Sequence, residues 1–388
     1  MYNKVGVYFL FQPDEIMSTL DWLKWVSPQC SENIQLFGIV NGYLGSEWKE
    51  KLDKIDFLDI TYSERNRGVA GGRNIVISRA MEWGADLLIS LDNDILVPQD
   101  YFSRMVSEYS KLKAFKPNLG IITPTIFDIN RLIKLYGIEE LKTLFLENSS
   151  IKSRENLLEK RDELSKEDYF YHLGVSGWKG CYLVSPLFDK FYRSKRFEET
   201  VLSQNGNKDK YKFVWHRSEK RIRDGIIDGR IEYLKADTLP GGLHVFESNY
   251  IQTYGQFDER FNPYGFEDSE LCIRGVEDGL EHYLVRSVFV AHDLDQRFEN
   301  RAPSVTFFTR GKVRRILMNR HIKDVGEKLY LLYDTFVLFP MAIFQSSNEK
   351  IEKKLQYCFN LYYGFLFVPR RRFIESFLRL FNRGTSQR

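Results

Sequence analysis

Cysteine and histidine are scarce in this chain of 388 residues, which has four cysteines and six histidines. The cysteines stand alone at Cys30, Cys181, Cys272 and Cys358, with no C-x-x-C pair and no histidine at metal-ligand spacing. This pattern argues against a zinc site or a disulfide framework and is typical of a reducing compartment. We therefore expect a cytoplasmic protein.

Long hydrophobic runs are also missing. No uninterrupted apolar stretch reaches the roughly 18 residues of a membrane-spanning helix. The nearest, residues 329–344, contains Asp334 and Pro340. The apolar run at 5–11 is short and has no small-residue cleavage site after it, so we expect a first β-strand there rather than a signal peptide.

No excess of one charge marks the whole chain, whose formal net charge is +3 from 56 basic and 53 acidic residues. With 43% hydrophobic and 28% charged residues, the composition excludes disorder and argues against a dedicated nucleic-acid binder. The charge is unevenly placed, however, because residues 301–388 hold 17 basic and 6 acidic side chains. We expect two regions, a domain over 1–300 and a basic, aromatic-rich helical region over 301–388.

Strand and helix patterns alternate along the first hundred residues. Strands are predicted at 5–11, 34–40, 57–62 and 86–91, and helices at 15–26, 48–52 and 71–83. A helix at 98–113 and strands at 120–124, 182–184 and 287–291 follow. The alternation predicts an α/β fold with a mostly parallel sheet and helices on both faces, where ligands bind at the carboxyl ends of the strands. Two polar insertions, at about 128–170 and 189–230, fit either specificity elements or solvated surface.

A glycine-rich segment, Glu64 to Asn74, leads into the third predicted helix. Glycines let the backbone approach a ligand, and the free N–H groups of a helix N-terminus bind phosphate. The segment matches neither a Walker loop nor G-x-G-x-x-G, so P-loop and Rossmann interpretations lose their main support.

Two carboxylates, Asp92 and Asp94, flank Asn93 at the end of the fourth predicted strand. Such a pair suits Mg²⁺ or Mn²⁺ bridged to a diphosphate. A turn or a helix cap is the alternative explanation. His292, at the end of the last predicted strand, could complete a metal site, although a structural histidine is the simpler interpretation.

A third motif places Glu267 and Asp268 at the start of a predicted helix, after Gly241-Gly242. The helix dipole favours ionised carboxylates there, and such a carboxylate facing a cleft can act as a general base. N-capping is the alternative. Glu270 and Arg274, four residues apart, are compatible with a surface ion pair.

Together and in this order, these segments resemble the family 2 glycosyltransferases and the wider GT-A fold. The resemblance covers about residues 5–297 and rests on Asn66-x-Gly68 with Arg73-Asn74, Asp92-Asn93-Asp94 (a DxD motif), Gly241-Gly242 through Phe257-Asp258-Glu259, Tyr264-Gly265-Phe266-Glu267-Asp268 (an ED motif) and His292. The expected architecture is a GT-A domain with a helical C-terminal extension. The glycine pair and the ED segment are also similar to animal galactosyltransferases and to retaining N-acetylgalactosaminyltransferases.

The resemblance implies a metal-dependent, inverting transfer of a hexosyl group from a nucleotide sugar, most commonly a UDP-sugar, to a hydroxyl of a glycan or lipid-linked acceptor. It implies a place in bacterial surface-glycan synthesis. By residue, it assigns the base to Asp268, acceptor orientation to Glu267, and Mn²⁺ or Mg²⁺ binding to Asp94 and His292. The implied donor-binding residues are Phe11, Asn41, Asn66, Gly68, Arg73, Asp92 and Asn93, and the acceptor-side residues are Trp178, Gly241 and Gly242. For Trp178, which could stack against a sugar ring, a tryptophan of the core is the alternative.

One departure from the family pattern keeps a second interpretation open. Asn41 ends the second predicted strand, where many members have an aspartate that holds the nucleotide base. A catalytically inactive, nucleotide-sugar-binding or scaffolding protein is therefore the alternative. A nucleotidyltransferase would need a basic, glycine-rich loop after the first strand, and Phe11-Gln12-Pro13 offers none.

The C-terminal region combines aromatic and aliphatic residues with arginines, such as Phe336 to Phe344 near Arg314 and Arg315. Such helices suit the anionic inner face of the cell membrane, which would place the active site near a lipid-linked acceptor. Packing on the catalytic domain or on a second subunit is the alternative, and nucleic acid is a weaker one.

Overall fold

The structure, a computed structural model, describes residues 2–146, 226–227, 230–231, 233–239, 241–263, 265–292, 303–346 and 350–366. The chain divides into two compact units, whose described residues lie within 2–292 and within 303–366. The strand predicted at 182–184, Trp178 and most of both predicted insertions lie outside the described residues.

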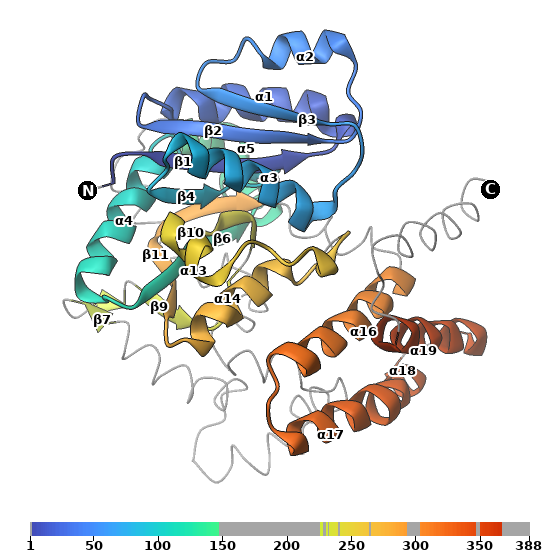
Figure 1. The fold of residues 1–388 in the computed structure, drawn as a ribbon. Helices are drawn as coiled ribbons and strands as arrows, with labels where there is room; N and C mark the ends of the chain where they lie inside the picture. Colours follow the sequence, from blue (N-terminus) through green and yellow to red (C-terminus); the bar gives the residue numbers. More distant parts are fainter. Residues whose placement is uncertain are drawn as a thin grey trace. The chain divides into compact units, whose positions relative to one another are not determined.

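The first unit is built on a mixed sheet of nine strands in the order β3-β2-β1-β4-β10-β6-β11-β5, with β9 also paired to β11 (Figure 1). Its strands are β1 (Val5–Phe11), β2 (Ile34–Asn41), β3 (Leu58–Ser63), β4 (Leu87–Ser90), β5 (Ile95–Leu96), β6 (Leu119–Asp128), β9 (Tyr233–Ala236), β10 (Val245–Glu247) and β11 (Glu281–His292). The four strands β1 to β4 run parallel, and β11 is parallel to β6. Strand β10 lies antiparallel between β4 and β6, while β5 and β9 pair antiparallel with β11. The α/β prediction is confirmed.

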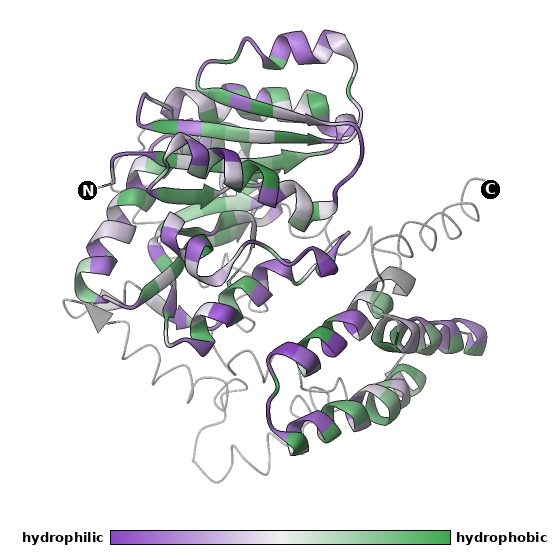
Figure 2. Cartoon of the chain, viewed as in Figure 1, coloured by the Kyte–Doolittle hydropathy of each residue, from purple (hydrophilic) through white to green (hydrophobic). Residues whose placement is uncertain are grey.

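Helices cover both faces of this sheet, as predicted. Helices α1 (Ile16–Val26) and α4 (Tyr101–Phe115) share one apolar core with Val7 and Phe9 of β1. On the other face, α3 (Gly68–Trp83), α13 (Ser248–Tyr254) and α14 (Glu267–Glu277) pack around Tyr8. Successive residues of β1 thus point to opposite cores, which explains why the strand is almost continuously apolar (Figure 2).

The remaining described elements of this unit are peripheral. Helix α2 (Ser46–Leu52) joins β2 to β3, α5 (Ile129–Leu146) follows β6, and β7 (Ile226–Ile227) with β8 (Arg230–Ile231) forms a separate two-stranded sheet.

Three differences from the predicted elements affect the site. Helix α3 begins at Gly68 rather than at residue 71, so the glycines of the glycine-rich segment lie in its first turns. Strand β11 is 12 residues long instead of five. Strands β5, β9 and β10 were not predicted, because segments of two to four residues are too short to show a periodic pattern.

The second unit is helical, as predicted for the C-terminal extension. It contains α16 (Pro303–Arg320), α17 (Val325–Tyr333), the π-helical turn η7 (Asp334–Leu338), α18 (Phe339–Ser346) and α19 (Ile351–Leu366). Helices α16 and α19 approach each other closely at two glycines. A methyl group on Gly311 would lie 2.0 Å from the carbonyl oxygen of Leu361, and a methyl group on Gly364 would lie 2.1 Å from the carbonyl oxygen of Phe308. Among the described residues, no helix is both long and apolar enough to cross a lipid bilayer.

Candidate functional site

The site lies at the carboxyl-end edge of the parallel strands, where Asp92 follows β4. The backbone N–H of Asp92 donates to the carbonyl of Gly242 at 3.1 Å, which joins this segment to the turn η5 (Gly241–Leu243). A methyl group on Gly242 would lie 2.3 Å from Oδ2 of Asp92. Only glycine lets the backbone come this close to the carboxylate.

The same turn also contacts the N-terminus of α14. The backbone N–H of Gly241 donates to Oδ2 of Asp268 at 2.9 Å, and that of Ser269 donates to Oδ1 at 2.6 Å. A methyl group on Gly241 would lie 2.3 Å from Cβ of Asp268. The Gly241-Gly242 pair therefore brings the two sequence motifs together through its backbone, with Asp268 half-buried beside it.

The close approach gives a testable expectation for Gly242→Ala. The added methyl group must push the Asp92 carboxylate away, and overpacking of this kind costs about 1–3 kcal/mol. Chemical denaturation of the variant and of Gly45→Ala measures this cost. At Gly45 the nearest atom is 3.9 Å away, so we expect a change within about 0.5 kcal/mol there. Equal stability of the two variants would contradict the tight contact.

Arg73 of α3 joins the two motifs by charge. Its guanidinium donates to Oδ1 of Asp92 at 2.9 Å and to Oε1 of Glu267 at 3.3 Å, and it lies over the ring of Phe257. The Arg73 residue is only 4% exposed. Burial by itself lowers the pKa of Arg73, but Asp92 and Glu267 raise it above its ordinary value, so the side chain stays charged.

Glu267 is buried behind Asp268, and both of its oxygens are engaged. Oε2 accepts from the backbone N–H of Gly265 at 2.8 Å, while Oε1 faces Arg73. Burial and the neighbouring Asp268 raise the pKa of Glu267 to about 7, against the opposing effect of Arg73. Glu267 was predicted to orient an acceptor. At 3% exposure it instead contacts Arg73 and the backbone that precedes α14.

The loop between β3 and α3 is held by three asparagine side chains. Asn41 accepts from the N–H of Arg67 at 2.7 Å, and its amide group donates to Asn66 and to the carbonyl of Gly68, each at 3.2 Å. Oδ1 of Asn66 accepts from the N–H of Gly68 at 2.7 Å. Gly68 has φ +72°, a conformation that favours glycine. Asn41 and Asn66, both predicted to bind the donor, thus shape the loop that precedes α3.

Asn262 is the third asparagine, and the sequence interpretation missed it. Its Oδ1 accepts from the N–H of Ala70 at 3.1 Å, and its amide donates to the carbonyl of Arg67 at 2.8 Å. A methyl group on Gly68 would lie 2.3 Å from Oδ1 of Asn262. The only sequence signal was Asn262-Pro263, which marks a turn but does not reveal a partner almost 200 positions earlier.

Asp94 and His292 are neighbours, because β11 ends beside β5. His292 pairs with Ile95 in the strand register, and its Nε2 lies 3.5 Å from Oδ2 of Asp94. His292 is 4% exposed, and neither of its ring nitrogens has a hydrogen-bond partner among the residues that the structure describes, whereas the Asp94 side chain is 59% exposed. A buried imidazole without a hydrogen bond next to an open carboxylate suits a cation shared with a ligand. Within the described part of the chain, no cluster of three or more His, Cys, Asp or Glu side chains could hold a metal ion.

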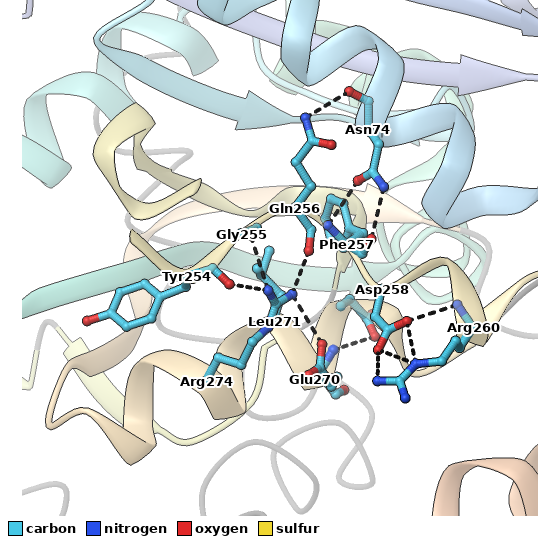
Figure 3. Close-up of polar contacts among 12 residues, drawn as sticks. Asn74, Tyr254, Gly255, Gln256, Phe257, Asp258, Arg260, Glu270, Leu271 and Arg274 are labelled. Carbon is cyan, nitrogen blue, oxygen red and sulfur yellow. Dashed lines mark hydrogen bonds and ion pairs between the residues drawn. The ribbon is translucent and has the colours of Figure 1, made fainter. Parts of the chain in front are cut away.

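Two further polar anchors, Asn74 and Arg274, hold the segment Tyr254 to Phe257 that precedes the ED motif (Figure 3). The side-chain amide of Asn74 donates to the carbonyl of Phe257 and accepts from its backbone N–H, each at 2.9 Å. Arg274 donates to the carbonyls of Tyr254, Gly255 and Gln256 and pairs with Glu270 at 3.1 Å. The side chains of Arg274 and Glu270 are 9% and 0% exposed, so the expected surface pair is a buried one that positions α14.

Two other predicted donor-binding side chains point elsewhere. Phe11 is 1% exposed and packs in the core beside Phe9. The amide of Asn93 donates to Oγ1 of Thr19 on α1 at 2.9 Å. Trp178, predicted on the acceptor side, lies outside the described residues. The structure therefore groups Arg73, the two motifs and the glycine pair, and sets the side chain of Phe11 apart from them.

Comparison with known proteins rests on structure alone, since no protein-family model and no curated protein sequence matches this chain. The structure is similar to that of GalNAc-T7 with UDP, GalNAc and Mn²⁺, with a TM-score of 0.50 and 14% identity over 92% of this chain and 54% of the other. This chain therefore spans about half of that structure's length. The likeness shows the α/β GT-A fold.

Two further solved structures score lower. One is residues 1–349 of S. aureus TarS, with a TM-score of 0.46 and 10% identity over 93% of this chain and 80% of the other. The other is the mannosyltransferase PcManGT from Pyrobaculum calidifontis in complex with GDP-Man and Mn²⁺, with a TM-score of 0.46 and 12% identity over 95% of this chain and 88% of the other.

Proposed function

We propose that this protein is a glycosyltransferase that moves a sugar from a nucleoside-diphosphate donor to a hydroxyl group of an acceptor. The observation that carries the proposal is the junction of the DxD and ED segments, 170 and more positions apart. Arg73 links Asp92 to Glu267, and Gly241-Gly242 contacts Asp92 and Asp268. A purely structural ion pair would not require a glycine backbone packed against both carboxylates.

Asp268 is the proposed general base. It is half-buried, and two backbone N–H groups hold its carboxylate. It would take the proton from the acceptor hydroxyl as that oxygen bonds to the anomeric carbon. The bond from this carbon to the phosphate oxygen breaks, and the diphosphate leaves with the electron pair. One displacement of this kind inverts the anomeric centre, in line with the resemblance to family 2.

Asp94 and His292 are the proposed ligands of a divalent cation, Mn²⁺ or Mg²⁺. The buried ring nitrogens of His292 and the exposed Asp94 carboxylate fit this role, and the donor's phosphate oxygens would complete the coordination. When bound, such a cation offsets the charge that develops on the departing diphosphate. The structure of GalNAc-T7 contains both UDP and Mn²⁺, which supports a UDP-sugar as the donor.

The remaining assignments follow the same proposal. Asn66, Gly68 and the backbone of Asn93 border the donor, with Asn41 and Arg73 shaping its site from beneath. Gly241 and Gly242 lie on the side of the acceptor, a glycan or a lipid-linked glycan. Asn41 was the feature that favoured an inactive scaffold. Its amide donates two hydrogen bonds that a carboxylate could not donate, which accounts for asparagine without loss of activity.

A donor screen tests the proposal. The protein with Mn²⁺ is incubated with each common nucleotide sugar, and release of the nucleoside diphosphate is measured. We expect slow hydrolysis of one donor that chelation abolishes and that Asp94→Ala and His292→Ala reduce by about 10²-fold or more. Asp59→Ala, which removes a surface ion pair with Arg79, is the control and should hydrolyse that donor normally.

Binding provides the second readout of the same screen. The hydrolysed donor's nucleotide should raise the melting temperature in the presence of Mn²⁺, and this shift should be smaller in both metal-site variants. If no nucleotide sugar is hydrolysed and no nucleotide raises the melting temperature, the transferase proposal is wrong.

A further inference from the structure

The second unit carries an exposed apolar face that the proposed site does not use. Six apolar side chains, each between 38% and 68% exposed, follow one another at intervals of three or four residues along α17, η7 and α18. They are Val325, Leu329, Tyr333, Val337, Met341 and Phe344, called the apolar stripe below. Figure 2 shows the hydrophobic character of α17 and α18.

The π-helical turn keeps the stripe on one face. In a regular α-helix, side chains four residues apart advance by about 40°, so the four such steps from Val325 to Met341 would move the stripe about 160° around the helix. A π-helical turn holds more residues per turn, and η7 lies in the middle of the stripe. It turns the helix back into phase, and three apolar residues between stripe positions, Leu331, Phe339 and Ile343, are buried.

The polarity of this helix differs in part from that expected for a helix in water. Asp334 and Thr335 are fully buried, and Asp334 accepts from Arg314 at 2.8 Å. The exposed stripe positions hold no charged residue. A helix facing water shows charged side chains outside and apolar ones inside, and a contiguous exposed apolar surface marks an interaction site.

The unit that carries the stripe has an excess of positive charge. The described residues of this unit that are exposed or half-exposed include eight basic and three acidic side chains, a net charge of +5. The basic ones are Arg310, Arg315, Arg320, Lys323, Lys328, Lys350, Lys353 and Lys354, and the acidic ones are Asp324, Glu327 and Glu352. Lys354 also donates to the carbonyl of Phe344, which joins the end of the stripe to the lysine-rich start of α19.

We propose that the apolar stripe lies on the surface of an anionic lipid bilayer. Two attractions hold an interfacial helix on a membrane, the burial of apolar side chains among acyl chains and the pairing of basic side chains with anionic headgroups. The second unit offers both kinds of side chain. A second copy of the chain is a poorer occupant. A two-fold dimer would bring together two units that each carry a net charge of +5 on their described exposed and half-exposed residues. The proposal stands apart from the proposed function, because binding to vesicles requires neither donor nor acceptor.

Sedimentation of the full-length protein with vesicles tests this proposal. The vesicles are a mixture of phosphatidylglycerol and phosphatidylcholine, compared with pure phosphatidylcholine. We expect binding to the anionic vesicles only, weakened at high salt, and at least about tenfold weaker partitioning for the double variant Leu329→Glu/Met341→Glu. The matched control is Met17→Glu/Phe115→Glu, which changes two side chains of the first unit that are 60% and 61% exposed and should bind like the wild type.

Two measurements keep the result decisive. Thermal unfolding must show that both double variants remain folded, and donor hydrolysis by the stripe variant without vesicles should equal that of the wild type. Failure of the wild type to sediment, or equal binding by the stripe variant, would overturn the proposal. Light scattering that finds a wild-type dimer, absent in the stripe variant, without vesicle binding would assign the face to a second copy.

Discussion

Replacing Asp268 by asparagine should abolish sugar transfer while the donor still binds. The substitution keeps the size of the side chain but removes the group that takes the proton, and loss of a general base costs on the order of 10²–10⁴-fold in rate. Since Asp268 accepts backbone N–H bonds at both oxygens, the asparagine amide must also face one N–H group. We therefore expect a loss of about 1–3 kcal/mol in stability beside the loss of activity.

The matched control for this variant is Asp278→Asn, at the far end of the same helix. Asp278 is exposed and accepts from the hydroxyl of Tyr254, so its replacement should leave the transfer rate unchanged. Single-turnover transfer and donor binding, measured separately, distinguish a lost base from a distorted site. Transfer by Asp268→Asn within about tenfold of the wild-type rate would remove Asp268 from the role of base.

Arg73→Met should have the largest effect on stability. The Arg73 side chain is 5% exposed, and its removal would leave Asp92 and Glu267 without their common counter-charge. Breaking a buried ion pair in this way costs about 3–5 kcal/mol, because a desolvated charge is left uncompensated. Donor hydrolysis should fall as well, since Arg73 sets the position of Asp92.

Arg79→Met, on the same helix, is the comparison for this prediction. Arg79 pairs with Asp59 at 2.7 Å, but its side chain is 50% exposed, and surface pairs contribute at most about 1 kcal/mol. Arg73→Lys should fall between the two, because one ammonium group cannot make both contacts of the guanidinium fork. Denaturant unfolding measures all three variants. Equal losses of stability for Arg73→Met and Arg79→Met would show that the buried contacts of Arg73 with Asp92 and Glu267 contribute no more to stability than a surface ion pair.

The motif residues show which contacts could not be predicted from the sequence. Asp92 and Asp94 were assigned from their place after an apolar strand, and the strand is there. Arg73 was assigned to the donor because its segment resembles the loop between the third strand and the following helix in family 2 glycosyltransferases. Its two partners are 19 and 194 positions away in the sequence, and no local pattern reveals such distances. Glu267 was assigned to the acceptor, although burial turns it toward Arg73.

The sequence by itself determined the order of the longer strands and helices in the first hundred residues, the helical C-terminal region and the identity of the motif residues, because periodicity and turn chemistry are local properties of a chain. Only the tertiary structure decided what each of these residues touches. The antiparallel strand β10 and the backbone of Gly241-Gly242 bring together segments far apart in the sequence, and the long strand β11 brings His292 to Asp94. Such contacts depend on burial and on long-range pairing, which arise only when the whole sheet has formed.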